Sequence, residues 1–539
     1  MKHAKVLDCT LRDGAYLVDK TFGDTTIQGI ISGLIDANID LIEIGFLQND
    51  GFGEGKTVFK NAKEAKKFVP KDKGKSEFTV LADYSRYDIS NLDVCDHTSI
   101  DAVRACFFKK ERFDVIDFCK EIKRKGYKLF IQPVDILGYT DAEIIEFIDL
   151  VNKIEPYCFS IVDTFGSMYA DDLQRVFSLI HHNLTPVSKM GFHSHNNLQM
   201  SNALSQKFLE MTLGKRNVVV DTTISGMGRG AGNTPTELVT QYMCAKLGYS
   251  YNMDAILDII DVYMENIRFR CQWGYNTSYF IAGSYSAHVN NIAYLKKKNT
   301  IQSKDIRYIL NKIGAAKRKR YDYDLLEDTY MNYLQSDIDD KRAMEILTEQ
   351  MKDKNIVILV PGQTIDLEKE KIEKEIQEKN AIVISVNFIH NTIETDYLYM
   401  SNLKRYTYWN TKPGFQDIPK ILTSNIKCED KNHITVSFNR LIKCGWENMD
   451  NSTILLLRLL DQLEVRSIGI AGFDGYDFKK ENTGNYFDDE LEVYEVYQNP
   501  IESNKEISLM LDDYFATRAN QIPITFITPS RFDNKGFNE

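Results

Sequence analysis

Short apolar runs alternate with longer amphipathic stretches through the first half of the chain. Eight such runs follow one another: Lys5–Asp8, Leu41–Phe46, Phe78–Ala82, Ala102–Phe107, Leu129–Val134, Cys158–Val162, Lys189–Phe192 and Asn217–Val220. The segments between them are typical of amphipathic helices, as in Thr26–Asn38, where apolar residues recur three and four positions apart. Strands that alternate with helices predict a parallel sheet. Eight units of about 30 residues fit a closed (β/α)8 barrel better than an open, doubly wound sheet.

The pattern changes after Asn233. Thr236–Leu247 and Met253–Arg268 are predicted helices, and Gly274–Ala287 is aromatic and loop-like. A second strand–helix rhythm then includes the runs Ile356–Val360, Ile382–Val386, Ile434–Phe438, Ser467–Ile470 and Ile524–Phe526. We therefore predict an α/β protein in three parts, listed here: a TIM barrel over 1–290, a helical connector over 291–350 and a Rossmann-like α/β domain over 351–539.

Composition restricts the class of protein. Of the 539 residues, 43% are hydrophobic and 27% charged, which is typical of a globular protein, and no apolar run has the ~20 residues of a membrane span. The chain begins without a secretory signal, so we expect a cytoplasmic protein. A net charge of −11 disfavours nucleic-acid binding. The basic cluster Lys317–Arg320 is interpreted as a solvated helix face or loop rather than a binding patch. Nine scattered cysteines without Cys-x-x-Cys spacing indicate reduced thiols, not a zinc site.

Polar residues follow five of the eight predicted strands, at the end where barrels of this type carry their active sites. These segments are Asp8–Gly14, Glu43, Asp163–Ser167, His193–Asn197 and Gly226–Asn233. His193 and His195 are two positions apart at a strand end, so both side chains point to the same side. With Asp13 as the third ligand they would form a facial triad for a divalent metal. The alternative is a pair of exposed loop histidines.

Other residues at this rim allow two interpretations each. Arg12 either pairs with a neighbouring acid or stabilises an oxyanion that develops on the substrate. Glu43 is either a buried partner of Arg12 or an aid to proton transfer. The glycine-rich run Gly226–Gly232 lacks the spacing of a dinucleotide or phosphate-binding loop. We expect it to pack closely and bring Asn233 toward the metal.

At these residues the chain resembles the DRE-TIM metallolyases, a family that includes HMG-CoA lyase, isopropylmalate and homocitrate synthases and 4-hydroxy-2-oxovalerate aldolase. The resemblance spans about residues 1–250 and is carried by Asp8-Cys9-Thr10-Leu11-Arg12-Asp13-Gly14, His193-Ser194-His195-Asn196 and Gly230-Ala231-Gly232-Asn233-Thr234. The Asp-Arg-Glu set that names the family looks like Asp13, Arg12 and Glu43.

The run Ala231–Thr234 is most similar to the aldolase branch, which implies a class II pyruvate aldolase. The resemblance implies Mn²⁺ or Mg²⁺ on Asp13, His193 and His195, with Asn233 as a further ligand. It also implies that Arg12 stabilises the enolate oxygen and that Thr164 bonds the pyruvate carboxylate. We expect Asp163 to belong to the same substrate site.

One position departs from the family. The aldolases carry a histidine two residues after the motif glycine, where this chain has Tyr16. A tyrosine acts as a base near neutral pH only if the metal or Arg12 lowers its pKa, which is ordinarily near 10. Otherwise Tyr16 shapes the pocket and another group takes the proton.

The C-terminal part also has turns that follow strands, where open α/β sheets bind ligands. They contain Gly362 and Thr364, Asn387, and Asp474, and a helix that begins near Gly362 could hold an anion. The pattern resembles the Rossmann-like fold of sialyltransferase-related and motility-accessory glycosyltransferases. The segment Trp273–His288 is similar to aldolase-like proteins of bacterial surface-polysaccharide pathways.

Three functional hypotheses follow. The first is a metal-dependent carbon–carbon lyase or aldolase that acts through a pyruvate-type enolate on an aldehyde or ketone acceptor, which could be a sugar or nucleotide-sugar. The second, on the same fold, is an acyl-CoA condensing enzyme or an HMG-CoA lyase-like enzyme. The third is a bifunctional protein whose C-terminal domain binds a nucleotide or nucleotide-sugar. We expect small-molecule substrates, no nucleic-acid or membrane partner, and a homo-oligomer.

Overall fold

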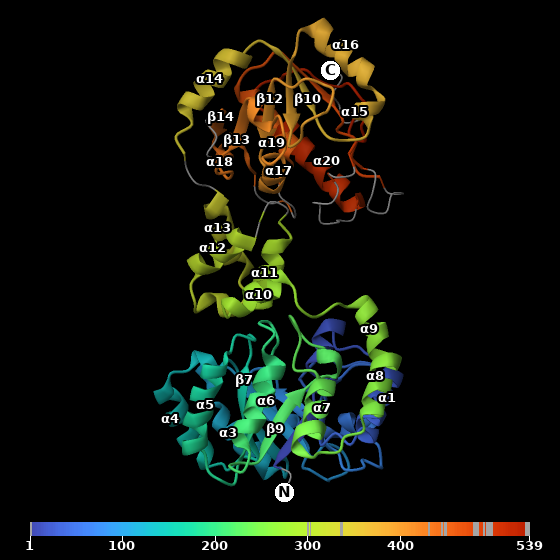
Figure 1. The fold of residues 1–539 in the computed structure, drawn as a ribbon, viewed down its shortest axis with the longest axis vertical. Helices are drawn as coiled ribbons and strands as arrows, with labels where there is room; N and C mark the ends of the chain where they lie inside the picture. The colour runs from blue at the N-terminus through green and yellow to red at the C-terminus, as the bar shows by residue number, and fades with distance from the viewer. Residues whose placement is uncertain are drawn as a thin grey trace. The chain divides into compact units, whose positions relative to one another are not determined.

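The computed structural model describes residues 3–298, 301, 303–334, 338–428, 432–443, 446, 450–477, 485–488, 491 and 500–533. The chain divides into two compact units. The first comprises Met1–Ile292 with Ala315–Tyr321, and the second comprises Ala293–Gly314 with Asp322–Glu539 (Figure 1). The sequence-based bounds 1–290, 291–350 and 351–539 stay predictions for parts that fold independently.

The first unit is a closed parallel barrel, as predicted. Its strands are β1 (Ala4–Asp8), β2 (Leu41–Leu47), β4 (Glu77–Asp83), β5 (Ala102–Phe107), β6 (Lys128–Pro133), β7 (Cys158–Asp163), β8 (Lys189–Ser194) and β9 (Val218–Thr222). The sheet closes because β1 pairs with both β2 and β9. A two-residue strand, β3 (Val58–Phe59), was not predicted, and it adds to the edge of β2.

Helices surround the barrel (Figure 1). They are α1 (Asp24–Asp36), α2 (Ala62–Ala65), α3 (Val115–Arg124), α4 (Asp141–Asn152), α5 (Ala170–Asn183), α6 (Ser201–Thr212), α7 (Thr236–Leu247) and α8 (Met253–Ile259). A five-residue π-helical turn follows α8 and leads into α9 (Glu265–Arg270). No helix among the described residues is both long and apolar enough to cross a membrane.

Alternation along the strands divides the core into two layers. Leu7, Leu41 and Val219 belong to a small buried cluster that also contains residues from β5, β6 and β7. Their strand neighbours Val6 and Ile42 belong instead to the large cluster shared with the helices. Because successive strand residues point to opposite faces, the small cluster fills the barrel interior. Glu43, two positions after Leu41, therefore also points inward.

Two predictions for the segments after the barrel are wrong. Gly274–Ala287 is not simply a loop, because it contains helix α10 (Thr277–Ser284), which Asn276 caps by accepting a hydrogen bond from the Tyr279 amide. The basic cluster at 317–320 is solvated only in part. Arg318 Nε donates to the Tyr285 carbonyl at 2.6 Å, and Lys319 pairs with Asp135, which follows β6. These contacts hold the segment over the carboxyl ends of the barrel strands.

The second unit contains a seven-stranded parallel sheet, the predicted Rossmann-like arrangement. Its strands are β10 (Asn355–Leu359), β11 (Ile382–Val386), β12 (Tyr397–Met400), β13 (Lys420–Thr423), β14 (His433–Val436), β15 (Ser467–Ala471) and β16 (Ile524–Phe526). They lie in the order β14-β13-β12-β11-β10-β15-β16, so the direction of winding reverses between β10 and β15. The sequence pattern missed β12 and β13, which are four residues long and begin with Tyr397 and Lys420.

Helices of the second unit precede the sheet and connect its strands. Those before it are α11 (Val289–Lys296), which begins in the first unit, α12 (Ser303–Ile313), α13 (Tyr323–Leu334) and α14 (Lys341–Met351). The others are α15 (Thr364–Leu367), α16 (Lys369–Lys379), α17 (Leu403–Trp409), α18 (Phe438–Leu441), α19 (Ser452–Gln462) and α20 (Pro500–Thr517). The helical character predicted for 291–350 is thus present in its described residues.

Asp8 joins the two ends of the barrel. Its carboxyl group accepts hydrogen bonds from the Thr236 hydroxyl at 2.7 Å and from the Thr10 amide at 2.9 Å. Burial raises the pKa of Asp8 from 3.8 to about 6. An acid with a higher pKa in the folded state takes up a proton on folding, so its contribution to stability is lost as pH rises toward the folded pKa.

We therefore expect Asp8→Asn to gain unfolding free energy relative to the wild type as pH rises from 4 to 7, by about 3 kcal/mol. Urea unfolding of both proteins at unit pH intervals measures this difference. Asp117→Asn, whose side chain is 90% exposed, is the control and should show a flat difference. A flat difference for Asp8→Asn as well would contradict the account.

Candidate active site

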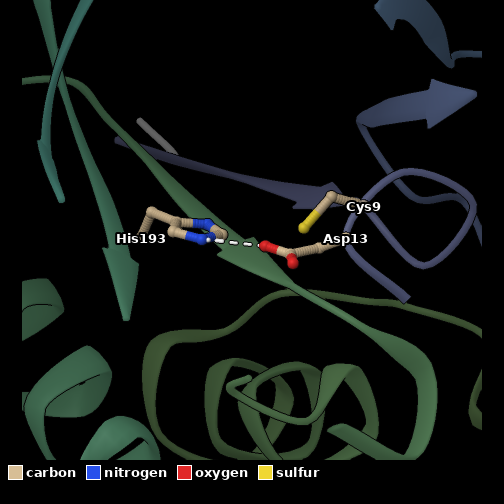
Figure 2. A group of neighbouring side chains, drawn as sticks. All are labelled: Cys9, Asp13 and His193. Carbon is tan, nitrogen blue, oxygen red and sulfur yellow. Dashed lines mark ion pairs between the residues drawn. The ribbon is translucent and has the colours of Figure 1, made fainter. Parts of the chain in front are cut away.

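Asp13, His193 and His195 meet at the carboxyl end of the barrel. Asp13 follows β1, His193 lies in β8, and His195 comes directly after it. The Oδ2 atom of Asp13 is 3.1 Å from His193 Nε2 and 3.8 Å from His195 Nε2. Figure 2 shows the Asp13 carboxylate directed at the His193 ring, with the Cys9 sulfur beside it. The two histidines are therefore not exposed loop residues.

The glycine-rich run brings Asn233 to the same place. Asn233 forms an antiparallel bridge with His195, and its Nδ2 donates to the Met227 carbonyl at 3.2 Å. A Cβ at Gly228 would lie 2.1 Å from that Nδ2, so only glycine leaves room for the amide. The side-chain oxygen of Asn233 is thereby left without a hydrogen bond in the described structure.

The donor set fits a hard divalent cation. Asp13 Oδ2 and Asn233 Oδ1 are buried oxygens without a hydrogen-bond partner among the described residues. Buried polar atoms in native proteins are nearly always bonded, so two that converge beside a pair of imidazoles indicate a ligand position. Carboxylate, amide oxygen and imidazole suit Mg²⁺ or Mn²⁺.

Cys9 could complete an alternative group, because its sulfur and ligand atoms of Asp13 and His193 all lie within 4.8 Å of one another. The Cys9 thiol, however, donates to the Thr222 carbonyl at 3.3 Å. Burial raises the pKa of Cys9 well above its ordinary value. A neutral thiol is a poor ligand for a hard cation, which favours the histidines and Asn233 over the sulfur.

Arg12 lies between two carboxylates. Its Nε donates to Glu43 Oε2 at 2.7 Å, and its Nη1 is 3.0 Å from Asp13 Oδ2. Burial alone would raise the pKa of Asp13, but Arg12 and the two histidines outweigh it and hold that pKa well below its ordinary value. Glu43 is thus a buried partner of Arg12, one of its two predicted roles.

A second arginine, Arg104 in β5, continues the chain of charges. It is fully buried, donates to Glu43 Oε2 at 2.8 Å, and pairs with Asp221 at the end of β9. Asp221 Oδ2 in turn lies 3.0 Å from His193 Nδ1. This contact leaves Nε2 of His193 to face Asp13 and fixes the ring orientation.

The pairs close into a ring, which we call the charge ring. Its members in order are Asp13, Arg12, Glu43, Arg104, Asp221 and His193. Three carboxylates face two guanidinium groups, so the ring carries one negative charge when His193 is neutral. That charge favours a bound cation.

Sequence reasoning missed Arg104 and Asp221 because both are single charges inside otherwise apolar strands. Their signal was present, since a charged residue at an inward-facing strand position needs a buried partner.

Tyr16 is not set up as a base in the described structure. Its ring packs edge-on against Phe46 at 5.4 Å between centroids. Burial raises the pKa of Tyr16 despite the nearby charges of Arg229 and Arg12. The lowered pKa that a basic role requires is therefore absent, and Tyr16 is a protonated phenol near neutral pH.

Asp163 and Thr164 hold the loop after β7. The Asp163 carboxylate accepts hydrogen bonds from the Ser167 amide at 2.9 Å and the Ser194 hydroxyl at 3.2 Å. Burial raises the pKa of Asp163 to about 6. Thr164 Oγ1 accepts from the Asp135 amide at 2.8 Å and keeps its own proton to donate. A substrate contact is consequently open to Thr164 more than to Asp163.

In the second unit the predicted turn residues contact one another. Asp474 Oδ2 accepts from the Thr364 amide at 2.9 Å, so a carboxylate already takes the position where an anion was predicted. Gly362 and Asp474 border a cavity of about 190 Å³ that also contacts Asn387 and the start of α19. Asp474 borders a second cavity, of about 310 Å³, beside Thr364. Both lie where the winding reverses, the usual ligand position of open α/β sheets.

Known proteins resemble the barrel in sequence. Residues 3–262 match the family model described as HMGL-like. The chain is 25% identical over 357 residues to 4-hydroxy-2-oxovalerate aldolase 4 of Paraburkholderia xenovorans, covering 61% of this chain and 95% of that protein. It is 25% identical over 270 residues to 4-hydroxy-2-oxovalerate aldolase 2 of Comamonas testosteroni, covering 48% and 73%.

Among solved structures, the HMG-CoA lyase of Bacillus subtilis is 14% identical, with a TM-score of 0.41, and the match covers 50% of this chain and 94% of that one. Residues 3–262 are therefore an HMGL-like domain of the DRE-TIM metallolyase family, and the chain is a carbon–carbon lyase of the aldolase type that carries a second α/β domain.

Proposed function

We propose that the protein is a divalent-metal-dependent aldolase that joins a pyruvate-type enolate to a carbonyl acceptor, or cleaves the product. The observation that carries this proposal is the convergence of two unbonded buried oxygens, Asp13 Oδ2 and Asn233 Oδ1, beside His193 and His195. These residues would hold Mn²⁺ or Mg²⁺. When bound there, the cation supplies Lewis-acid polarisation of the keto oxygen of a 2-oxo acid.

The chain's own groups would do the rest. Arg12 is fixed through Nε and Nη1, so its Nη2 group is free to donate to the oxygen that becomes negative in the enolate. The Thr164 hydroxyl would bond the carboxylate of the same molecule. Tyr16, protonated near neutral pH, would donate its proton to the acceptor oxygen as the new bond forms.

The cation site makes a first prediction. Protein stripped with EDTA should rebind one equivalent of Mn²⁺, followed by loss of the free Mn²⁺ signal in electron paramagnetic resonance. Asp13→Asn and His193→Ala should abolish tight binding. Asp221→Asn should weaken it about 10–100-fold, because it orients His193. His182→Ala, an exposed histidine of α5, is the matched control. Unchanged stoichiometry in the Asp13 and His193 variants would refute the site.

A second prediction concerns Arg12. In D₂O the Mn²⁺-loaded protein should exchange the methyl protons of pyruvate without any acceptor, as seen by proton NMR. Arg12→Lys keeps a charge for Asp13 and Glu43 but loses the planar fork, so we expect exchange to slow about 10²–10³-fold. Bound Mn²⁺ is measured in the same samples, so that loss of the cation is not mistaken for loss of the oxyanion contact. Exchange at the wild-type rate would rule out this role.

We also propose that the second unit binds a nucleotide-sugar, since two cavities adjoin at Asp474 where the sheet reverses. Calorimetry of the full chain with CMP-, UDP- and GDP-sugars tests this, and we expect one of the three to bind. Ser452→Trp, at the first residue of α19, should block binding by filling the smaller cavity, while Ser90→Trp on the barrel surface should not. Binding of none of them would leave the unit without this role.

A further inference from the structure

One arginine at the mouth of the barrel carries a charge that no described acidic side chain neutralises. Arg229 lies in the glycine-rich loop after β9, and its guanidinium carbon is 4.0 Å from the centre of the Tyr16 ring. The guanidinium forms no ion pair and no hydrogen bond within the described part of the chain. Arg12 and Arg104 differ, since each of them contacts two carboxylates.

The residues around Arg229 are those of the candidate active site. Tyr16 lies under its guanidinium, and His195 and His288 are close enough to sense its charge. Burial is the main cause of the low pKa of these two histidines, about 4 each, and the charge of Arg229 lowers both further. The guanidinium therefore lies beside the proposed cation site, on the Tyr16 side.

Further cations lie at the same end of the barrel. The pKa of Lys20 is lowered, first by burial and then by positive neighbours that include Arg86 and Arg229. Lys319 is held by Asp135 above the loop after β6. In a chain of net charge −11, this local excess of positive charge draws anions toward the mouth.

We propose that Arg229 binds a carboxylate or phosphate on the carbonyl acceptor, so that the acceptor of this enzyme is an anionic aldehyde or ketone. The proposal rests on the aldol function proposed above. Pyruvate is assigned to Arg12 and Thr164, whereas Arg229 stacks on Tyr16, which faces the acceptor. A guanidinium whose donors are all free offers the two parallel hydrogen bonds that carboxylate and phosphate accept.

The reaction balances without another reagent. The bond that forms joins C3 of pyruvate to the acceptor's carbonyl carbon. The proton that leaves C3 is matched by the one that the acceptor's oxygen takes up. Arg229 changes no bond, and it positions the acceptor through a group away from the reacting carbon, which lowers the entropy cost of the encounter.

Competition between matched acceptors tests the proposal. Mn²⁺-loaded protein with pyruvate receives equal amounts of succinic semialdehyde and butanal, or of glyceraldehyde 3-phosphate and glyceraldehyde. Because both members of a pair compete for the same enolate, the product ratio does not depend on how fast the enolate forms. We expect the wild type to prefer one anionic member at least 10-fold, and the pair that shows this identifies carboxylate or phosphate.

Arg229→Gln should reduce that preference at least 10-fold, and Arg229→Lys should keep most of it. Arg124→Gln, a 70% exposed arginine of α3, is the matched control and should leave it intact. Calorimetry with succinate and glycerol 3-phosphate gives a readout without turnover, in which Arg229→Gln should weaken binding of the same class about 10-fold.

The outcomes separate the two proposals. Proton exchange in pyruvate without any anionic preference overturns the role of Arg229 and leaves the aldol function standing. A preference that survives Arg229→Gln does the same. If Arg229→Gln raises the KM for pyruvate in the exchange reaction and leaves the product ratio unchanged, Arg229 binds the donor and the inference is wrong. Absence of both exchange and product removes the aldol function, and the inference with it.

Discussion

The charge ring inside the barrel is the constraint on which the rest of the site depends. Each of its ions is buried, and taking a single charge out of water costs several kcal/mol unless a partner compensates it. Here every member has two neighbours of opposite or hydrogen-bonding character, from Asp13 through Arg12, Glu43, Arg104 and Asp221 to His193. Removing one would leave two others unpaired, so the geometry of Asp13 and His193 is fixed by strands far from them in sequence.

The ring also explains how one fold supplies both rigidity and an open ligand position. Below it, the apolar cluster around Leu7 and Val219 fills the barrel interior. Above it, the glycine-rich loop is held against His195 by the bridge to Asn233, where Gly228 leaves space for the amide. The polar atoms left unbonded are those that face the space between Asp13, Asn233 and the histidines. Preorganised donors of this kind need no rearrangement when charge develops on a substrate.

Much of the site could be predicted because its residues lie in short motifs. Asp13 and Arg12 follow one strand, and His193 and His195 end another, so strand alternation and barrel closure were enough to bring them together. Arg104 and Asp221 could not be recognised in the same way, since each is a lone charge in an apolar strand whose partners are set only by the closed barrel. The missed strands β12 and β13 are four residues long, and Tyr397 and Lys420 disguise them. Asp474 was expected to leave an anion position open, but its carboxylate occupies that position through Thr364, a contact between turns more than a hundred residues apart.

The central claim is that the charge ring holds Asp13 and His193 in place for a single divalent cation. A crystal structure of the protein grown with Mn²⁺ and oxalate, with anomalous scattering to locate the metal, tests it most directly. The account predicts one ion bound by Asp13, His193 and His195, with His193 Nδ1 still on Asp221 and oxalate beside Arg12. An ion bound through the Cys9 sulfur, or a strong anomalous peak elsewhere with none between Asp13 and the histidines, would contradict it.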